Sequence, residues 1–158
     1  MKTLIDSFDR QFRAVHERSV LLIGRVPADK LFWKPRDLGR TMAMFSCGEY
    51  ILRSAAAVEQ CFGGITTKLW DDPFEWTLPE KLSTPALVLE YLGEVEETRQ
   101  KGFAYFTGDG DLARQMPAPD RLRPIHDILL DTVARAENFQ GRAFSIFRMF
   151  SDEKVPGF

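Results

Sequence analysis

One stretch of the chain, residues 124–150, constrains the class of fold more than any other. It reads PIHDILLDTVARAENFQGRAFSIFRMF, and apolar or small residues recur in it at steps that alternate between four and three. These residues are Ile125, Leu129, Thr132, Ala136, Phe139, Ala143, Ile146 and Phe150. The spacing is typical of one face of an α-helix that packs against other helices in a left-handed bundle. Pro124 at the first helical position and Asp127 in the first turn favour a helix start at this point.

Three further segments carry the same spacing, and we expect helices over residues 3–24, 41–62 and 84–106. Gly63 and Gly64 indicate the end of the second helix, whereas Thr84 followed by Pro85 indicates the start of the third. No segment shows a convincing strand pattern. The sequence therefore predicts an all-α fold, an antiparallel four-helix bundle with long connectors, whose helices cross at about 20°.

The connectors are long and rich in aromatic residues. Within residues 26–40, the sequence VPADKLF predicts a single helical turn, and the residues after it are expected to be extended before Pro35. Residues 65–82 carry Trp70, Phe74 and Trp76, which are costly to leave in water. A connection of this length either seals the end of the core or lines a ligand site, and both interpretations stay open.

Length and charge exclude several classes of function. With 158 residues, the chain is expected to form one domain over residues 1–158. The net charge is -2 and the signs are interspersed, so no basic stripe predicts contact with nucleic acid. No apolar run reaches the ~20 residues of a membrane span, and residues 1–10 lack the apolar segment of a secretion signal. We therefore expect a cytoplasmic protein without a membrane partner.

The sequence has two cysteines and two histidines. Cys47 and Cys61 fall on the same expected helix, where a rise of about 1.5 Å per residue separates them by roughly 21 Å. That distance is too long for a disulfide, so both are expected to be free thiols that behave as small buried hydrophobes. His16 and His126 are expected to have surface or structural roles.

Two residues on the inner faces need an explanation. Gly48 lies in the middle of the second helix, where glycine costs ~1 kcal/mol relative to alanine. It either lets a neighbouring backbone approach closely or leaves space. Arg135 precedes Ala136, so it lies at the edge of the last apolar face, one turn before Phe139. The functional interpretation of the sequence depends on this arginine.

Three motifs, in this order and spacing, suggest a family. They are VPADKLFWKPRDLGRT before the second helix, NFQGRAF in the last helix, and KVPGF at the end of the chain. Together with the order of helices and the connector lengths, they resemble the DinB/YfiT-like four-helix-bundle superfamily over essentially the whole chain. The resemblance implies a relative of metal-dependent enzymes, because many members bind Zn or Ni through one histidine of the second helix and two of the last. Some members transfer low-molecular-weight thiols, and members often form dimers.

The resemblance places the three ligand positions on Gly48, Arg135 and Phe139, and none of these side chains can ligate a metal. The expected site is therefore a degenerate one, without a metal or other cofactor. A non-standard site remains an alternative, because a borderline-soft metal needs three or four converging N, S or O ligands. Such a site would have to recruit Glu49, Glu137, Asn138 or a histidine. Helical phase points the first three of these outward.

Three hypotheses follow from the altered site. In the first, the missing imidazole at position 48 opens a pocket in which Arg135 presents a planar, permanently charged fork. The pocket candidates are Phe45, Gly48, Thr132, Arg135, Phe139, Trp70 and Trp76. Such a pocket suits a small carboxylate or phosphate that carries an apolar body.

The second hypothesis is a structural or dimerising protein, in which Phe139 fills the volume of the lost metal site and Arg135 extends to solvent along its apolar stem. The third is a thiol transferase or hydrolase that uses a non-standard metal site. Family analogy is its main support, and fold alone does not determine function.

Overall fold

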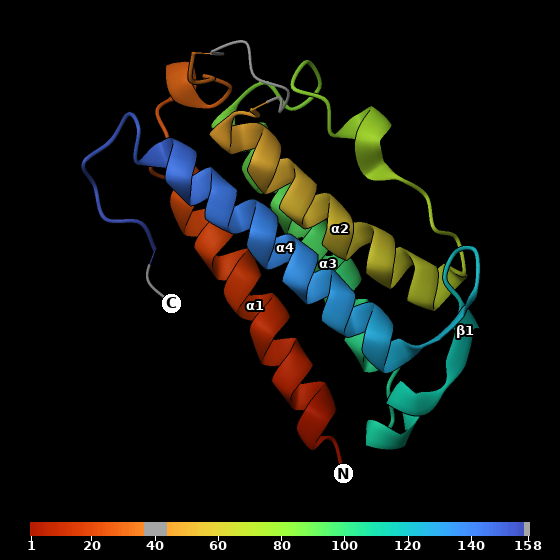
Figure 1. Ribbon diagram of the computed structural model, residues 1–158. Coiled ribbons are helices and arrows are strands. Elements are labelled where there is room, and N and C mark those ends of the chain that lie inside the picture. The colour runs from red at the N-terminus through yellow and green to blue at the C-terminus, as the bar shows by residue number, and fades with distance from the viewer. Residues whose placement is uncertain (37–43, 157–158) are drawn as a thin grey trace.

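The computed structural model describes residues 1–36 and 44–156, and most of these residues are helical. Four long helices lie side by side (Figure 1): α1 (Thr3–Ile23), α2 (Cys47–Thr67), α3 (Pro85–Ala104) and α4 (Ile125–Phe147). The described parts of the connectors contain three short 3-10 helices: η1 (Ala28–Lys30), η2 (Pro73–Trp76) and η3 (Asp109–Ala113). The prediction of a mostly helical chain is confirmed, as is the single turn expected in VPADKLF, which is η1.

The helices do not all run antiparallel to their neighbours. Helices α2 and α4 do, because Tyr50 stacks on Phe139 while Cys61, further along α2, lies beside Thr132. Helices α1 and α3 are antiparallel as well, since Lys2 bonds to the carbonyl of Phe106 at the far end of α3. Helices α2 and α3 instead run in the same direction, as do α1 and α4 (Figure 1). The reason is the long connection of residues 68–84, which returns along the outside and starts α3 at the same end as α2.

The start and end of α2 differ from the prediction. The helix begins at Cys47, because Ser46 forms a capping box: its hydroxyl accepts from the Glu49 N–H at 3.1 Å, and the Glu49 carboxylate accepts from the Ser46 N–H at 2.8 Å. Residues 41–43 of the expected helix lie outside the described residues. The helix also continues through Gly64 and ends at Thr67, followed by Lys68 in the left-handed conformation, with φ of 62°.

The predicted stop at Gly63 and Gly64 is wrong because Gly64 serves packing. A Cβ atom there would lie 2.3 Å from the ring of Trp70, so only glycine leaves room for the indole. The helix needs no glycine stop, because Lys68 itself takes the left-handed position and its N–H bonds to the carbonyl of Gly64.

The other boundaries fall within a few residues of those predicted. Thr84 caps α3 through the N–H of Leu87, as the sequence predicts, and the helix ends at Ala104. Helix α4 spans Ile125–Phe147 rather than 124–150. Pro124 is extended and ends strand β2 (Leu122–Pro124), which pairs antiparallel with β1 (Gln115–Pro117). The expectation of no strand is thus wrong for this short ladder, whose proline-bounded strands are too short to show an alternating pattern.

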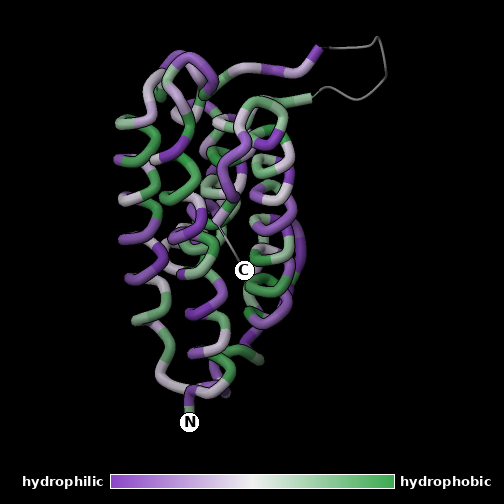
Figure 2. The backbone as a smooth tube through the Cα atoms, turned by 90° about the vertical axis from the view of Figure 1, so that its left-hand side faces the viewer, coloured by the Kyte–Doolittle hydropathy of each residue, from purple (hydrophilic) through white to green (hydrophobic). Residues whose placement is uncertain are grey.

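The inner faces predicted from the spacing form the core. Along each helix, hydrophobic and hydrophilic residues alternate (Figure 2), and the apolar ones gather between the helices. Leu4 is an exception: its side chain, in the first turn of α1, is 52% exposed. Arg99 is the opposite case: it lies on the inner face of α3 and is 1% exposed. No helix of the described chain is both long enough and apolar enough to cross a membrane.

Candidate functional site

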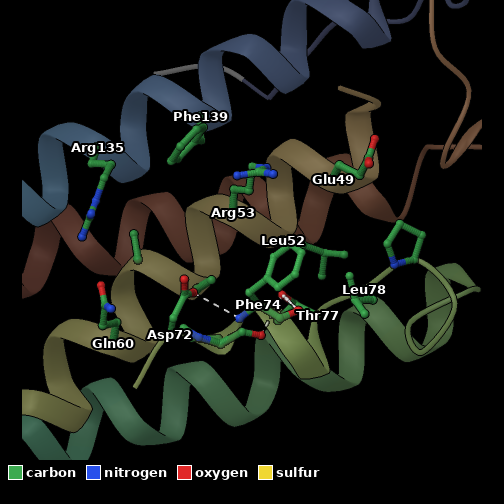
Figure 3. Close-up of a pocket in the computed structure, with 14 residues that line it drawn as sticks. Glu49, Leu52, Arg53, Gln60, Asp72, Phe74, Thr77, Leu78, Arg135 and Phe139 are labelled. Carbon is green, nitrogen blue, oxygen red and sulfur yellow. Dashed lines mark hydrogen bonds between the residues drawn. The ribbon is translucent and has the colours of Figure 1, made fainter. Parts of the chain in front are cut away.

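A groove opens on the side of α2 that the sequence assigns to solvent. This first groove has a volume of about 380 Å³ and lies between α2, α4 and the connection that contains η2 (Figure 3). Its lining combines an apolar floor with four charged side chains. It is lined by Glu49, Leu52, Arg53, Ala56, Ala57, Gln60, Asp72, Pro73, Phe74, Thr77, Leu78, Pro79, Arg135 and Phe139.

Two arginines supply the positive charge of the first groove. Arg135 extends from α4 toward α2, and Arg53 rises from α2 toward α4 (Figure 3). The guanidinium of Arg53 lies 4.0 Å from the ring centroid of Phe45 and is held there by a cation–π contact. Among the residues that the structure describes, no carboxylate pairs with Arg135 and no hydrogen bond occupies its guanidinium. Arg135 is therefore available to an anion.

The two acids of the first groove already have partners. Glu49 accepts from both the N–H and the hydroxyl of Ser46, each at 2.8 Å, and lies 3.4 Å from the ammonium of Lys34. Asp72 accepts from the N–H of Phe74 at 3.1 Å and caps η2. These carboxylates are turned toward the starts of α2 and η2. The charges of the lining balance, with two guanidiniums and two carboxylates, and Arg135 is the charged group that the described residues leave without a partner.

A second groove adjoins the first at the end nearer the strands. Its volume is about 320 Å³. It is lined by Gln60, Cys61, Trp70, Ala118, Pro119, Arg123, Ile128, Asp131, Thr132 and Arg135. Asp131 forms an ion pair with Arg123. Gln60 and Arg135 border both grooves, and Figure 3 shows these two side chains facing each other from α2 and α4.

The structure brings together some of the predicted pocket residues. Arg135 and Phe139 line the first groove, and Arg135, Thr132 and Trp70 line the second. Phe139 is backed by Tyr50, with ring centroids 6.4 Å apart. Thr132 is buried, and its hydroxyl donates to the carbonyl of Ile128 at 2.7 Å.

Three predicted pocket residues border neither groove. Gly48 is buried against the first connector, where a Cβ atom would lie 2.7 Å from the carbonyl oxygen of Leu31. The glycine therefore permits a close backbone approach, and its N–H bonds to that same carbonyl at 2.8 Å, so the expectation of open space at position 48 is wrong. Phe45 packs edge-on against Tyr50.

Trp76 points away from both grooves. Its indole N–H donates at 3.3 Å to Glu59, which also accepts a hydrogen bond from Tyr91. Trp70 behaves as a core-sealing residue as well as a groove wall: its indole lies on Gly64, and its N–H donates to the carbonyl of Pro117 at 2.9 Å. This bond ties the start of the long connection to the short ladder.

The residues considered for a non-standard metal site lie apart from one another. Glu49 lines the first groove, whereas Glu137 pairs with Arg18 on the α1 side of α4 and Asn138 is exposed. Nowhere in residues 1–36 and 44–156 does the structure gather three or more histidine, cysteine, aspartate or glutamate side chains in a way that could hold a metal ion.

The histidines and thiols also lie outside the grooves or are inert within them. Burial lowers the pKa of His16, which lies near Glu96 and Arg99. His126 is exposed and contacts the ring of Phe8 edge-on. Cys47 and Cys61 are free and buried, as predicted, and burial raises the pKa of both thiols to about 12. Cys61 therefore borders the second groove as a protonated thiol.

Several groove residues were missed because they belong to the polar side of α2. Arg53 and Gln60 follow the helical phase that the sequence assigns to solvent. That assignment is right for α2 considered alone, but the connection of residues 68–84 returns over this side of the helix. The polar side of α2 therefore becomes one wall of the first groove. Phe74 and Leu78 lie on that connection, whose path the sequence does not determine. The cluster of aromatic residues in this long connector is the signal for a ligand site, and the sequence leaves open whether the connector lines such a site or seals the core.

The protein is thus mostly helical, with a groove between α2 and α4 into which Arg53 and Arg135 project. Searches of protein-family models, of curated proteins and of solved structures found no match to the chain.

Proposed function

We propose that the chain is a DinB/YfiT-like four-helix bundle without the histidine triad, and that it binds a small anion with an apolar body in the first groove. The three sequence motifs and the helix order support the family. The observation that carries the function is Arg135, whose guanidinium lines the groove without a carboxylate partner among the described residues.

The first groove offers partners for both the acid group and the apolar body of such a ligand. A guanidinium offers two parallel N–H donors, which match the two oxygens of a carboxylate or phosphate. Leu52, Phe74, Leu78 and Phe139 provide apolar surface on both sides of the groove. A volume of about 380 Å³ lies within the range typical of small-molecule sites. An apolar body would displace water from these walls, and the acid group would face Arg135.

Thermal-shift and calorimetric titrations with benzoate, phenyl phosphate and 4-phenylbutyrate test the proposal. We expect at least one of these anions to raise the melting temperature of the wild type, and Arg135→Gln to abolish most of that shift. Arg148→Gln is the matched control, because Arg148 lies beyond the end of α4 and lines neither groove. Equal shifts for wild type and Arg135→Gln would refute the role of Arg135.

A second candidate, a dimerising function, is favoured by a different surface. Between α1 and α4 runs an apolar groove of about 350 Å³. Its lining includes Leu4, Phe8, Leu130 and Val133, and the side chains of Leu4 and Leu130 are 52% and 50% exposed. A second copy of the chain could cover these residues through the same face. Light scattering of wild type and Leu130→Glu tests this: a dimer that Leu130→Glu converts to a monomer supports the candidate, and a monomeric wild type rejects it.

A further inference from the structure

The two grooves adjoin at Gln60 and Arg135, and the two grooves taken together are called the path. Both are bordered by Gln60 and Arg135, which face each other across the junction (Figure 3). The first groove leads from this pair toward Phe74 and Leu78, and the second leads toward Trp70 and Pro119. A ligand held at Arg135 therefore has space on two sides.

The position of the cation within this path restricts the chemistry of the ligand. A carboxylate or a phosphate monoester ends a molecule, so an anion of that type would fill one groove and leave the other empty. A phosphodiester places its single negative charge between two substituents, and two non-bridging oxygens share that charge. The fork of a guanidinium matches these two oxygens.

The neighbours of Arg135 fit such an internal anion. The amide nitrogen of Gln60 donates to the carbonyl of Trp70 at 3.2 Å, which fixes this side chain at the junction of the two grooves. The acids along the path have partners: Glu49 with Ser46 and Lys34, Asp72 with the N–H of Phe74, and Asp131 with Arg123. None of these pairs includes Arg135.

The side chains that line the two grooves differ in chemistry, and this difference indicates which substituent of the diester would lie in which groove. The first groove offers Leu52, Leu78 and the rings of Phe74 and Phe139, so it suits an apolar or aromatic group. The second groove offers the indole of Trp70 beside Thr132 and the Arg123–Asp131 pair. It suits a group with a flat face and polar edges.

We propose that the ligand class of this site is a phosphodiester whose two substituents lie in the two grooves, with its phosphate on Arg135 at the junction between them. This inference rests on the proposed function and adds the second groove to it. The geometric observation behind it is the sharing of Gln60 and Arg135 by both grooves.

Isothermal titration with diphenyl phosphate, phenyl phosphate and diphenylacetate tests the assignment. Two blocking variants divide the path: Ala56→Trp fills the first groove only, and Pro119→Trp fills the second only. We expect diphenyl phosphate to bind at least tenfold more tightly than phenyl phosphate. Each blocking variant should weaken the diester at least fivefold, whereas Pro119→Trp should leave phenyl phosphate binding unchanged. Thermal melts of each variant establish that it is folded before its titration is read.

The outcomes separate the two proposals. If Pro119→Trp leaves diester binding unchanged while Arg135→Gln weakens it, the second groove is not used and the inference is overturned, but the proposed function stands. Diphenylacetate that binds as tightly as diphenyl phosphate would overturn the phosphodiester class in favour of a branched carboxylate. If no anion binds, or if Arg135→Gln binds all of them like the wild type, both proposals fail.

Discussion

The buried arginine of α3 gives the sharpest prediction about stability. Arg99 donates from Nε and Nη2 to the two carboxylate oxygens of Glu96, at 2.7 and 2.6 Å, and from Nη1 to Asp9 of α1. Its side chain is 1% exposed, whereas those of Glu96 and Asp9 are 15% and 24% exposed. Removing one partner of a fully buried pair costs about 3–5 kcal/mol. Because both acids reach some water, we expect Arg99→Met to lower the free energy of unfolding by about 2–4 kcal/mol.

Urea denaturation at neutral pH, followed by far-UV circular dichroism, measures this loss. A triple variant with Arg99→Met, Asp9→Asn and Glu96→Gln is the control, because it removes the uncompensated charges along with the arginine. We expect the triple variant to recover a large part of the loss. A loss below about 0.5 kcal/mol for Arg99→Met, the range of ordinary surface substitutions, would refute the reasoning. So would a triple variant less stable than the single one.

The same pair sets the dependence on pH. Burial raises the pKa of Glu96, but the hydrogen bonds and charge of Arg99 outweigh burial and hold the pKa below its usual value of 4.5. A carboxyl whose pKa is lowered by folding adds stability above its ordinary pKa and loses it as the pH falls through the lowered one. Wild type should therefore lose stability more steeply than Arg99→Met as the pH falls below about 4.5.

Three other substitutions or reactions test the packing. Gly64→Ala places a methyl carbon 2.3 Å from the neighbouring indole and should lower the free energy of unfolding by about 1–3 kcal/mol, whereas Gly63→Ala, which has room, should raise it by up to about 1 kcal/mol. Gln140→Met removes three buried hydrogen bonds between α1 and α4 and should cost about 1–3 kcal/mol in urea denaturation. Cys47 and Cys61, with pKa values raised to about 12, should react with a disulfide reagent at pH 8 only after denaturant is added.

The sequence predicts the helices well because their signal is local. The four-three spacing identifies the inner faces, and even Arg99, which breaks the apolar pattern of α3, lies where the spacing puts it. Helix ends are predicted less well because a glycine can either end a helix or make room for a neighbouring side chain, and a helix can be capped in several ways. Gly64 resembles a helix stop, but its role is to leave room for the indole of Trp70, six residues further along the chain. The start of α2 is set by a capping box, and the apolar spacing gives no sign of its serine, Ser46.

The site could be predicted only in part, because it is formed by a long connection rather than by a periodic element. Arg135 stood out since a charge bordered an apolar stripe, and it does line a groove. Gly48 also stood out, and of its two interpretations the close backbone approach is confirmed, because the volume of the missing side chain is filled by a backbone from elsewhere in the chain. Here that backbone is the carbonyl of Leu31. No local rule predicts which segment will fill such a space.

The charge of the first groove follows from the way the fold uses its acids. Each helix start exposes N–H groups that need acceptors, and carboxylates and hydroxyls can supply them whereas arginine cannot. Two such starts, at Ser46 and at Asp72, lie beside the groove, and each holds a carboxylate close to the backbone. Arg53 and Arg135 have no equivalent role in the backbone. The arrangement that begins α2 and η2 thereby occupies the two carboxylates of the groove and leaves Arg135 open to a ligand, so the proposed preference for an anion follows from how the chain folds around the groove.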